Sequence, residues 1–171
     1  METIIGIGFL FCGIAGGLFE WVKRQKIKQK RLEEFQLFVK KTMFAMETEH
    51  IKLIPYFLQY QCKDEVLSDF LNEVALRLQE HRYPKGEMAW EEVFMEKKQN
   101  WDMDEETFLM MIHAGNGLFG KHRTENLKFL QKSVEDMEVQ LRKNKERDSK
   151  DRTVWIPVGM LGGVMIAILL V

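Results

Sequence analysis

The chain has 171 residues, of which 46% are hydrophobic and 30% charged, and its formal net charge at pH 7 is −1. This length allows one hydrophobic core but is short for two domains. Two cysteines, Cys12 in an apolar segment and Cys62 in a polar one, exclude a disulfide scaffold, and we expect no disulfide between them.

The first predicted element is an apolar segment, residues 4–22, which contains a single acid, Glu20. As a helix it reaches roughly 29 Å, close to the thickness of the hydrocarbon core of a bilayer. A cleaved signal peptide is the alternative, but it needs basic residues ahead of the apolar segment. The basic residues follow instead, at 23–31. We therefore predict that residues 1–22 are an uncleaved membrane anchor, whose basic flank stays in the cytoplasm.

Residues 23–154 form the second predicted segment, a cytoplasmic domain that begins with a basic stem. Between residues 23 and 41 the acids are Glu33 and Glu34, against eight basic residues. Beside a membrane, such a stretch marks topology and meets anionic lipid headgroups. Nucleic-acid binding is the alternative, but no surface of interleaved aromatic and basic residues elsewhere in the chain extends the stretch.

Apolar residues recur every three or four positions in this segment, the period of one helix face. Asp64, and either Asp102 or Asp104, are placed as helix N-caps, while Pro55 and a loop at residues 83–86 interrupt the pattern. No run alternates as a strand would, so we predict an all-α fold: a compact bundle of about six helices, flanked by two transmembrane helices. The predicted apolar faces carry Leu32, Phe35, Val39, Met43, Met46, Leu67, Phe70, Leu71, Val74, Leu78, Ala89, Trp90, Val93, Phe94, Phe108, Leu109, Met111, Ile112, Leu127, Leu130, Val134, Met137 and Leu141.

Two acids, Glu47 and Glu49, lie at the end of the basic stem. They are two residues apart, so on one helix they cannot both face the core, and at least one should be solvated. They could cap or pair locally with Lys52 or the stem lysines. They could instead dock on a basic surface of a partner, and we name both as candidate partner-binding residues.

The glycine-rich stretch at residues 115–122 matches G-x-G-x-x-G and most of the Walker A pattern. Both patterns hold phosphate only between a strand and a helix. Here a helix-start pattern precedes the stretch, and His122 stands where Walker A has Ser or Thr. We therefore interpret Gly115, Gly117 and Gly120 as a tight turn between packed helices, where the glycines end one helix and permit close contact.

No residue pattern predicts catalysis or metal binding. Glu47, Glu49 and His50 are neighbours in sequence but point apart on a helix, and His113 and His122 flank the glycines without further ligands. There is no H-E-x-x-H, no paired cysteine set and no serine elbow. We therefore expect a protein that is not an enzyme, with no cofactor and no small-molecule substrate.

The chain closes with a charged stretch at residues 142–152, which predicts a solvated helical stalk, and an apolar segment at residues 155–171. A buried core helix is the alternative for the apolar segment, but its three glycines disfavour a helix in water and are common in membranes. We predict a C-terminal anchor. Since Lys150 and Arg152 flank it on the inner side, the topology is a hairpin with both ends outside.

Each predicted anchor carries two glycines four residues apart, Gly13 with Gly17 and Gly159 with Gly163. Such glycines share a helix face and let a second helix approach closely. Either the anchors pair, with each other or with other membrane proteins, or the spacing is coincidental because glycine is frequent in membrane helices.

Several short motifs run through the whole chain. They are Ile5-Gly6, Lys30-Arg31-Leu32, Met46-Glu47-Thr48-Glu49, Ala89-Trp90, the stretch from Gly115 to Gly120, and Val158-Gly159-Met160-Leu161-Gly162-Gly163. In this order and spacing they resemble the stage III sporulation protein AB family of endospore-forming bacteria.

The resemblance implies a role in assembly. Members of the family belong to a transenvelope channel complex between mother cell and forespore. Their soluble domain is similar to the cytoplasmic modules of the platform protein in type II secretion and type IV pilus systems. The implied partners are a hexameric secretion-type ATPase, similar to the stage III AA protein, other membrane subunits, and the lipid bilayer.

We therefore expect a non-enzymatic platform subunit that couples the ATPase to the channel. It would cross the mother-cell membrane facing the forespore twice, with its central domain in the cytoplasm. The alternative is a membrane-tethered regulatory or signalling module that binds another cytoplasmic protein.

Overall fold

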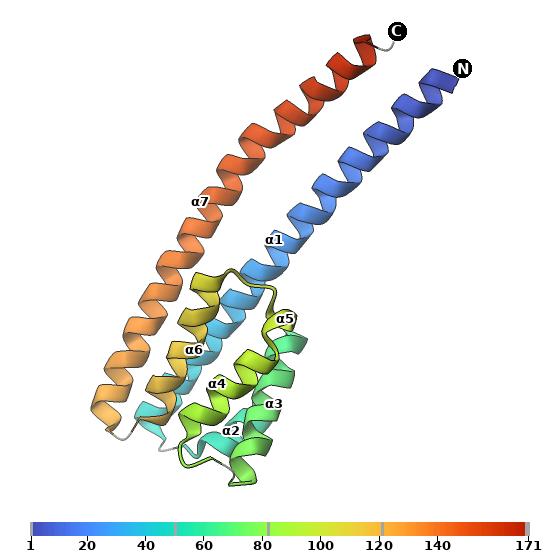
Figure 1. Cartoon of the computed structure of the whole chain (residues 1–171). Helices are drawn as coiled ribbons and strands as arrows, with labels where there is room; N and C mark the ends of the chain where they lie inside the picture. Colours follow the sequence, from blue (N-terminus) through green and yellow to red (C-terminus); the bar gives the residue numbers. More distant parts are fainter. Residues whose placement is uncertain (1, 50, 82, 121, 170–171) are drawn as a thin grey trace. The chain divides into compact units, whose positions relative to one another are not determined.

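The computed structural model describes the backbone of residues 2–49, 51–81, 83–120 and 122–169. Side chains are described from residue 16 to residue 150, except 18, 19, 50, 82, 121, 123 and 148. Within this backbone there are seven helices and no strand, so the predicted all-α class is confirmed (Figure 1). The helices are α1 (Glu2–Thr48), α2 (Leu53–Gln59), α3 (Glu65–Gln79), α4 (Gly86–Glu96), α5 (Lys98–Trp101), α6 (Glu105–Phe119) and α7 (Arg123–Leu169).

The chain divides into two compact units. One combines Met1–Gln29 with Arg142–Val171, and the other is Lys30–Leu141. The second unit is shorter than the predicted domain of residues 23–154, and both of its boundaries fall inside long helices. The predicted anchor and stem are parts of one helix, α1, and the predicted stalk and C-terminal anchor are parts of α7.

Among the residues whose side chains are described, no helix holds an apolar stretch long enough to cross a membrane. The predicted anchors at residues 1–22 and 155–171 lie almost entirely outside those residues, as do Gly13, Gly159 and Gly163. Gly17 is exposed, and a Cβ built on it meets nothing within 4 Å. The two membrane spans stay a prediction.

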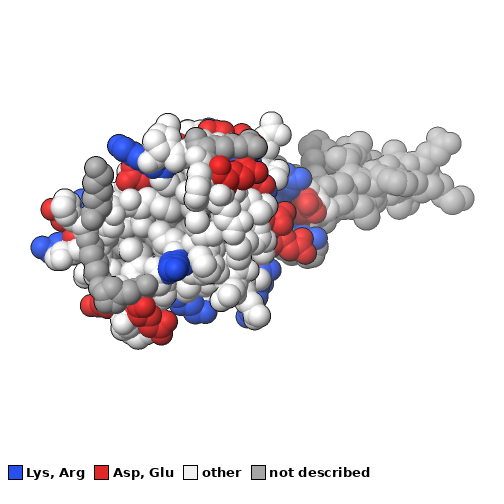
Figure 2. Space-filling model, turned by 90° about the horizontal axis from the view of Figure 1, so that it is seen from below, with Lys and Arg blue, Asp and Glu red and all other residues white. Residues whose placement is uncertain are grey.

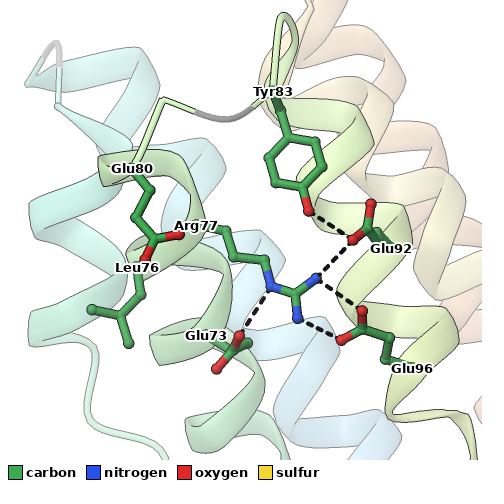
Figure 3. Close-up of a pocket in the computed structure, with 7 residues that line it drawn as sticks. All are labelled: Glu73, Leu76, Arg77, Glu80, Tyr83, Glu92 and Glu96. Carbon is green, nitrogen blue, oxygen red and sulfur yellow. Dashed lines mark hydrogen bonds and ion pairs between the residues drawn. The ribbon is translucent and has the colours of Figure 1, made fainter.

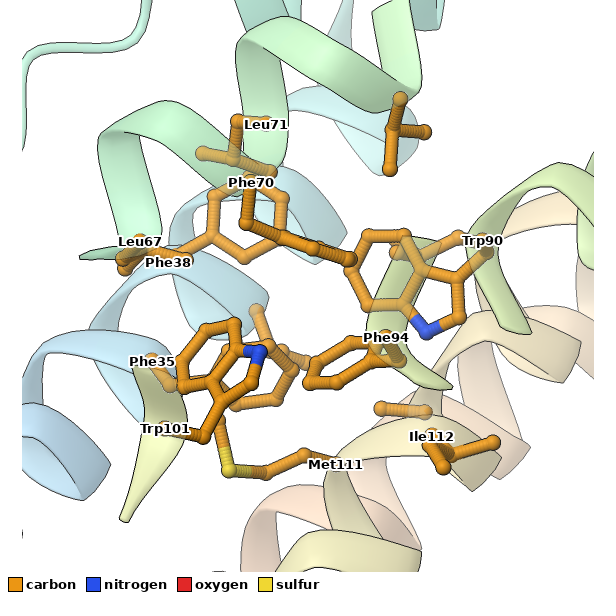
Figure 4. Close-up of a cluster of buried hydrophobic side chains, with 14 of the residues drawn as sticks. Phe35, Phe38, Leu67, Phe70, Leu71, Trp90, Phe94, Trp101, Met111 and Ile112 are labelled. Carbon is orange, nitrogen blue, oxygen red and sulfur yellow. The ribbon is translucent and has the colours of Figure 1, made fainter. Parts of the chain in front are cut away.

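Aromatic rings fill the core of the Lys30–Leu141 unit (Figure 4). The ring of Phe70 lies 4.1 Å from that of Phe94 and 4.7 Å from that of Trp90, measured between centroids. The stacked rings of Phe94 and Trp101 are 4.9 Å apart. Each such pair adds about 0.5–1.5 kcal/mol beyond its burial of apolar area. The rings come from α3, α4 and α5, so they join helices that are separate in the sequence.

Most of the predicted core positions are buried. Some predicted positions are not buried, however, and some buried positions were not predicted. Leu109 is 40% exposed, and Met43, Met46, Leu78 and Leu127 are half-buried. Phe38 and Trp101 are fully buried although the pattern did not include them. Phe38 lies beside the main apolar stripe of α1, where it packs against Phe57 of α2 and Trp90 of α4. Trp101 belongs to α5, which has four residues and is too short to show a helical period.

Two indole groups in this core lack the usual partner for a buried donor. Among the described residues, neither Nε1 of Trp90 nor Nε1 of Trp101 has a hydrogen-bond partner. Both indoles lie among aromatic rings instead, and Phe35 meets Trp101 edge to face at 90°. A buried donor without a partner costs about 1–3 kcal/mol, so the apolar contacts of these two large side chains outweigh that cost.

Aspartates start α3 and α6, as the sequence predicts. The Asp64 carboxylate accepts a hydrogen bond from the Leu67 backbone N–H at 2.9 Å, and Asp104 accepts one from the Thr107 N–H at 2.9 Å. The choice left open between Asp102 and Asp104 is thereby settled. Asp102 instead ends α5, in the left-handed conformation with φ 46°. Pro55 falls in the first turn of α2, where a missing N–H is tolerated.

A buried arginine fastens three segments together. Arg31 is 8% exposed, and its Nε donates to both oxygens of Asp64 at 3.1 and 3.2 Å. Its Nη1 donates to the backbone carbonyls of Asn100, at 2.9 Å, and Trp101. One guanidinium therefore links α1 to the start of α3 and the end of α5, and gives the short α5 partners for its last carbonyls.

The prediction of a turn at Gly115 and Gly117 was wrong, because α6 continues through both to Phe119 and ends at Gly120. A Cβ on Gly115 would lie 2.7 Å from Nε1 of Trp90, and one on Gly117 would lie 2.8 Å from Cδ2 of Leu130. Neighbouring side chains occupy that space. Close helix packing thus outweighs the cost of about 1 kcal/mol for a glycine in a helix.

Candidate protein-interaction surfaces

The first candidate surface is the end of α1, where the two predicted acids lie. Glu47 is in the last turn of the helix, and Glu49 follows it in the turn. Both side chains are exposed, which meets the expectation that at least one is solvated. The helix end is held by backbone and hydroxyl groups: Glu49 N–H donates to the Ala45 carbonyl at 2.9 Å, and Thr48 Oγ1 to that of Phe44 at 2.9 Å.

The electrostatics of this helix end disfavour acids. The C-terminus of a helix carries partial negative charge, so a carboxylate there costs about 0.3–1 kcal/mol. The last turn of α1 has no basic residue to offset it. Burial raises the pKa of the nearby Tyr56, and the charge of Glu49 raises it further, against a hydrogen bond with Thr42 that lowers it. The helix dipole therefore does not favour acids at this end of α1.

An exposed aromatic side chain shares this end of the helix. Phe44 is 63% exposed, although a phenyl ring is normally covered. It precedes Glu47 by three residues, so the two lie on one face of α1. The sequence pattern missed Phe44 because it falls outside the apolar stripe of the stem. Aromatic side chains are enriched in the core of protein interfaces, and polar side chains form the rim.

The second candidate surface lies on α3 and α4, around Arg77 (Figure 3). Nε of Arg77 donates to Glu73 at 3.0 Å, and Nη1 donates to Glu92 at 3.1 Å. Both terminal nitrogens also donate to the carboxylate of Glu96. Tyr83 completes the cluster by donating its hydroxyl to Glu92 at 2.7 Å. One guanidinium thus holds three carboxylates from two helices.

These contacts shift the ionisation of the groups that make them. Hydrogen bonds with Glu96 hold the pKa of Arg77 above its ordinary value, and the same contact lowers the pKa of Glu96. The hydrogen bond with Glu92 raises the pKa of Tyr83. The cluster lines a cavity of about 320 Å³ together with Leu76 and Glu80. Since four carboxylates surround one guanidinium, the cavity carries an excess of negative charge at neutral pH.

The sequence analysis did not predict this cluster, although one of its ion pairs could have been recognised from residue spacing. Glu73 and Arg77 are four residues apart on one helix, a spacing that favours an ion pair. The contacts from Arg77 to Glu92 and Glu96 join residues 15 and 19 positions apart. No local pattern predicts that α3 and α4 lie side by side.

The glycine stretch does not have the setting of a phosphate loop. Helix α6, not a strand, leads into Gly120, and the described backbone contains no strand that could replace it. The Asn126 side chain donates to the Gly120 carbonyl at 2.7 Å, so a helix cap occupies the space at the turn. Lys121 lies outside the described residues.

Metal ligands do not gather in the described part of the chain. There, no three His, Cys, Asp or Glu side chains lie close enough to hold an ion together. His113 is exposed within α6, and His122 is exposed immediately before α7. His50 lies outside the described residues.

Comparison with known proteins identifies the family. The family model for stage III sporulation protein AB matches residues 3–171. The chain belongs to that family. No curated protein and no solved structure matches it. A stage III sporulation protein acts in spore formation, so this chain has a role in sporulation.

Proposed function

We propose that this stage III sporulation AB protein is a non-enzymatic platform subunit, which couples a cytoplasmic secretion-type ATPase to a membrane channel. It crosses the mother-cell membrane facing the forespore twice, and its central helical domain lies in the cytoplasm. The family match supports the sporulation setting. The all-α domain and the basic residues that flank both apolar segments support a scaffold held at a membrane.

The observation that carries the proposal is the pair of exposed acids at the end of α1. Glu47 and Glu49 are placed where a carboxylate destabilises the helix, beside an exposed Phe44. Charged groups at the edge of an interface steer a partner and set its orientation. The partner proposed for this end is the hexameric ATPase, similar to the stage III AA protein, through a basic surface.

The test is a charge reversal at both acids, Glu47→Lys with Glu49→Lys, in sporulating cells. Both side chains are exposed, and substitutions at exposed positions usually change stability by less than about 0.5 kcal/mol. The variant should therefore fold and enter the membrane like the unmodified protein. Co-purification with the ATPase should be lost. In the unmodified protein, that co-purification should weaken with added salt.

A matched control reverses two acids on α7, Glu135→Lys with Asp136→Lys, which are also exposed and change the net charge equally. The control variant should still co-purify with the ATPase. If the α1 variant folds and still recruits the ATPase like the control, the acids are not the docking site. Recruitment of a different cytoplasmic protein by the unmodified chain, with no ATPase, would instead support the tethered regulatory module.

A further inference from the structure

Negative charge is concentrated on two adjacent helices. Helices α3 and α4 contact each other and lie side by side (Figure 1). Together they hold seven acidic residues and one basic residue, Arg77, a net charge of −6 in a chain whose net charge is −1. All other parts of the chain together are therefore net basic. The acids with exposed side chains are Glu65, Asp69, Glu91, Glu92 and Glu96.

Three large apolar side chains lie uncovered on the same two helices. Leu76 is 50% exposed, and Met88 and Met95 are each 48% exposed. The two methionines are seven residues apart, so they lie on one face of α4, with Glu91 and Glu92 between them. Methionine side chains adapt to varied partners, and they are frequent on surfaces that bind helices. Seen from below in Figure 2, the domain shows a largely uncharged surface with both acidic and basic side chains around it.

The ion pairs with Arg77 hold several carboxylates of this face in place before any partner binds. Glu73 of α3 and Glu92 and Glu96 of α4 are held by the same guanidinium, whose side chain is only 17% exposed. Binding then costs less side-chain entropy, because these carboxylates are already ordered. Three carboxylates against one guanidinium leave the cluster negative, so it still attracts a cation.

We propose that the outer face of α3 and α4, defined by Leu76, Met88, Met95 and their neighbouring acids, docks a basic amphipathic helix of a protein partner. Charge complementarity selects the occupant. Nucleic acid and anionic membranes are repelled by this face. An amphipathic helix with Lys or Arg beside an apolar stripe satisfies both the exposed apolar side chains and the carboxylates. This face does not include Glu47 and Glu49, so the proposal stands apart from the function proposed above.

The first experiment measures binding of a fluorescent synthetic helix of Leu and Lys to the full chain in non-ionic detergent. A peptide of the same composition, scrambled to remove the helical period, is the comparison. The amphipathic helix should bind about tenfold more tightly than the scrambled peptide, a difference of about 1.4 kcal/mol. Equal binding of the two peptides would show general charge attraction only, and would overturn the proposal.

Two variants separate the apolar and acidic contributions. Leu76→Ser with Met95→Ser leaves the charge unchanged, and Asp69→Lys with Glu91→Lys leaves the apolar side chains and the Arg77 cluster unchanged. Each should weaken binding by about tenfold, while the exposed positions leave folding intact, as thermal unfolding would verify. The Glu135→Lys, Asp136→Lys control matches the second variant in charge and should bind normally. Normal binding by the apolar variant would overturn the proposal.

A second experiment identifies the occupant in sporulating cells. A photo-reactive residue at position 95, introduced as Met95→p-benzoylphenylalanine, is cross-linked, and the attached peptide is sequenced. The expected peptide is a basic segment with helical periodicity of its apolar residues. An acidic peptide, a lipid, a second copy of this chain, or no adduct would each overturn the proposal.

Discussion

At the scale of single residues, Arg31 shows how one buried charged side chain can join distant segments. Its four hydrogen bonds join α1, the N-cap of α3 and the end of α5. The ion pair with Asp64 is largely shielded, with side-chain exposures of 10% and 16%. Breaking one half of such a pair leaves a charge without its counter-ion in a poorly solvated place.

We expect Asp64→Asn to lower the free energy of unfolding by about 3 kcal/mol, measured by denaturant unfolding of the full chain in detergent. Asparagine is a good N-cap, so loss of the helix start would contribute little. The double variant Arg31→Met with Asp64→Asn should recover part of the loss, because no charge is left unpaired. If Asp64→Asn is as stable as the unmodified protein, the ion pair contributes nothing.

Tyr60 supplies a prediction about pH. Burial, with smaller contributions from Tyr56, Glu34 and Cys62, raises its pKa to about 12 from a usual value of 10.0. The folded state therefore holds the phenolic proton more tightly than the unfolded state. This contribution to stability is complete below pH 10 and is lost as the pH rises toward 12.

The absorbance of phenolate during an alkaline titration should show one tyrosine that ionises near pH 12, and Tyr60→Phe should remove it. The same substitution should flatten the fall in stability between pH 10 and 12. A titration curve unchanged by Tyr60→Phe would contradict the assignment.

At the scale of helices, Gly115 shows how packing decides a local structure. Glycine favours a helix end, which is why the sequence predicts a turn there. The structure keeps the helix because Trp90 of α4 occupies the space beside Gly115. Helices α4 and α6 can approach this closely only where one of them lacks a side chain.

We therefore expect Gly115→Ala to destabilise the protein by about 1–3 kcal/mol through overpacking, despite the higher helix propensity of alanine. Thermal unfolding followed by circular dichroism measures this. His113→Ala, at an exposed position of the same helix, is the control and should change stability little. Equal melting temperatures for Gly115→Ala and the control would mean that α4 and α6 are not in close contact.

The sequence was informative where the determining interactions are local. Asp64 and Asp104 start helices through hydrogen bonds that span three residues. Asp64 was predicted, and Asp104 was one of the two candidates for its helix. The apolar stripe of α3 was predicted for the same reason. Trp101, the partners of Arg77 and the course of α6 through Gly115 depend on side chains from distant helices. Periodicity contains no information about those neighbours.

At the scale of the whole molecule, charge is unevenly distributed along the chain. Basic residues flank both apolar segments, whereas α3 and α4 are acidic. The positive-inside rule applies to the flanks and predicts that the central domain stays in the cytoplasm. Acids distributed farther along the chain have little influence on orientation.

Single cysteines introduced into a chain that carries Cys12→Ser and Cys62→Ser provide the measurement. In intact cells, a membrane-impermeant thiol reagent should label cysteines beside Met1 and after Val171. It should label none between residues 64 and 140 until the cells are opened. External labelling within 64–140 would contradict the hairpin topology.

The indole N–H groups of Trp90 and Trp101, which have no hydrogen-bond partner among the described residues, also have an optical consequence. An excited indole emits at shorter wavelength when nothing polar surrounds it, and both of these are fully buried among aromatic rings. Of the four tryptophans, Trp21 is 37% exposed, and Trp155 lies outside the described side chains. Replacing those two with phenylalanine would leave Trp90 and Trp101 as the emitting tryptophans, so the fluorescence would report on the core. If the packing between α4 and α5 loosened, the emission maximum would shift to longer wavelength.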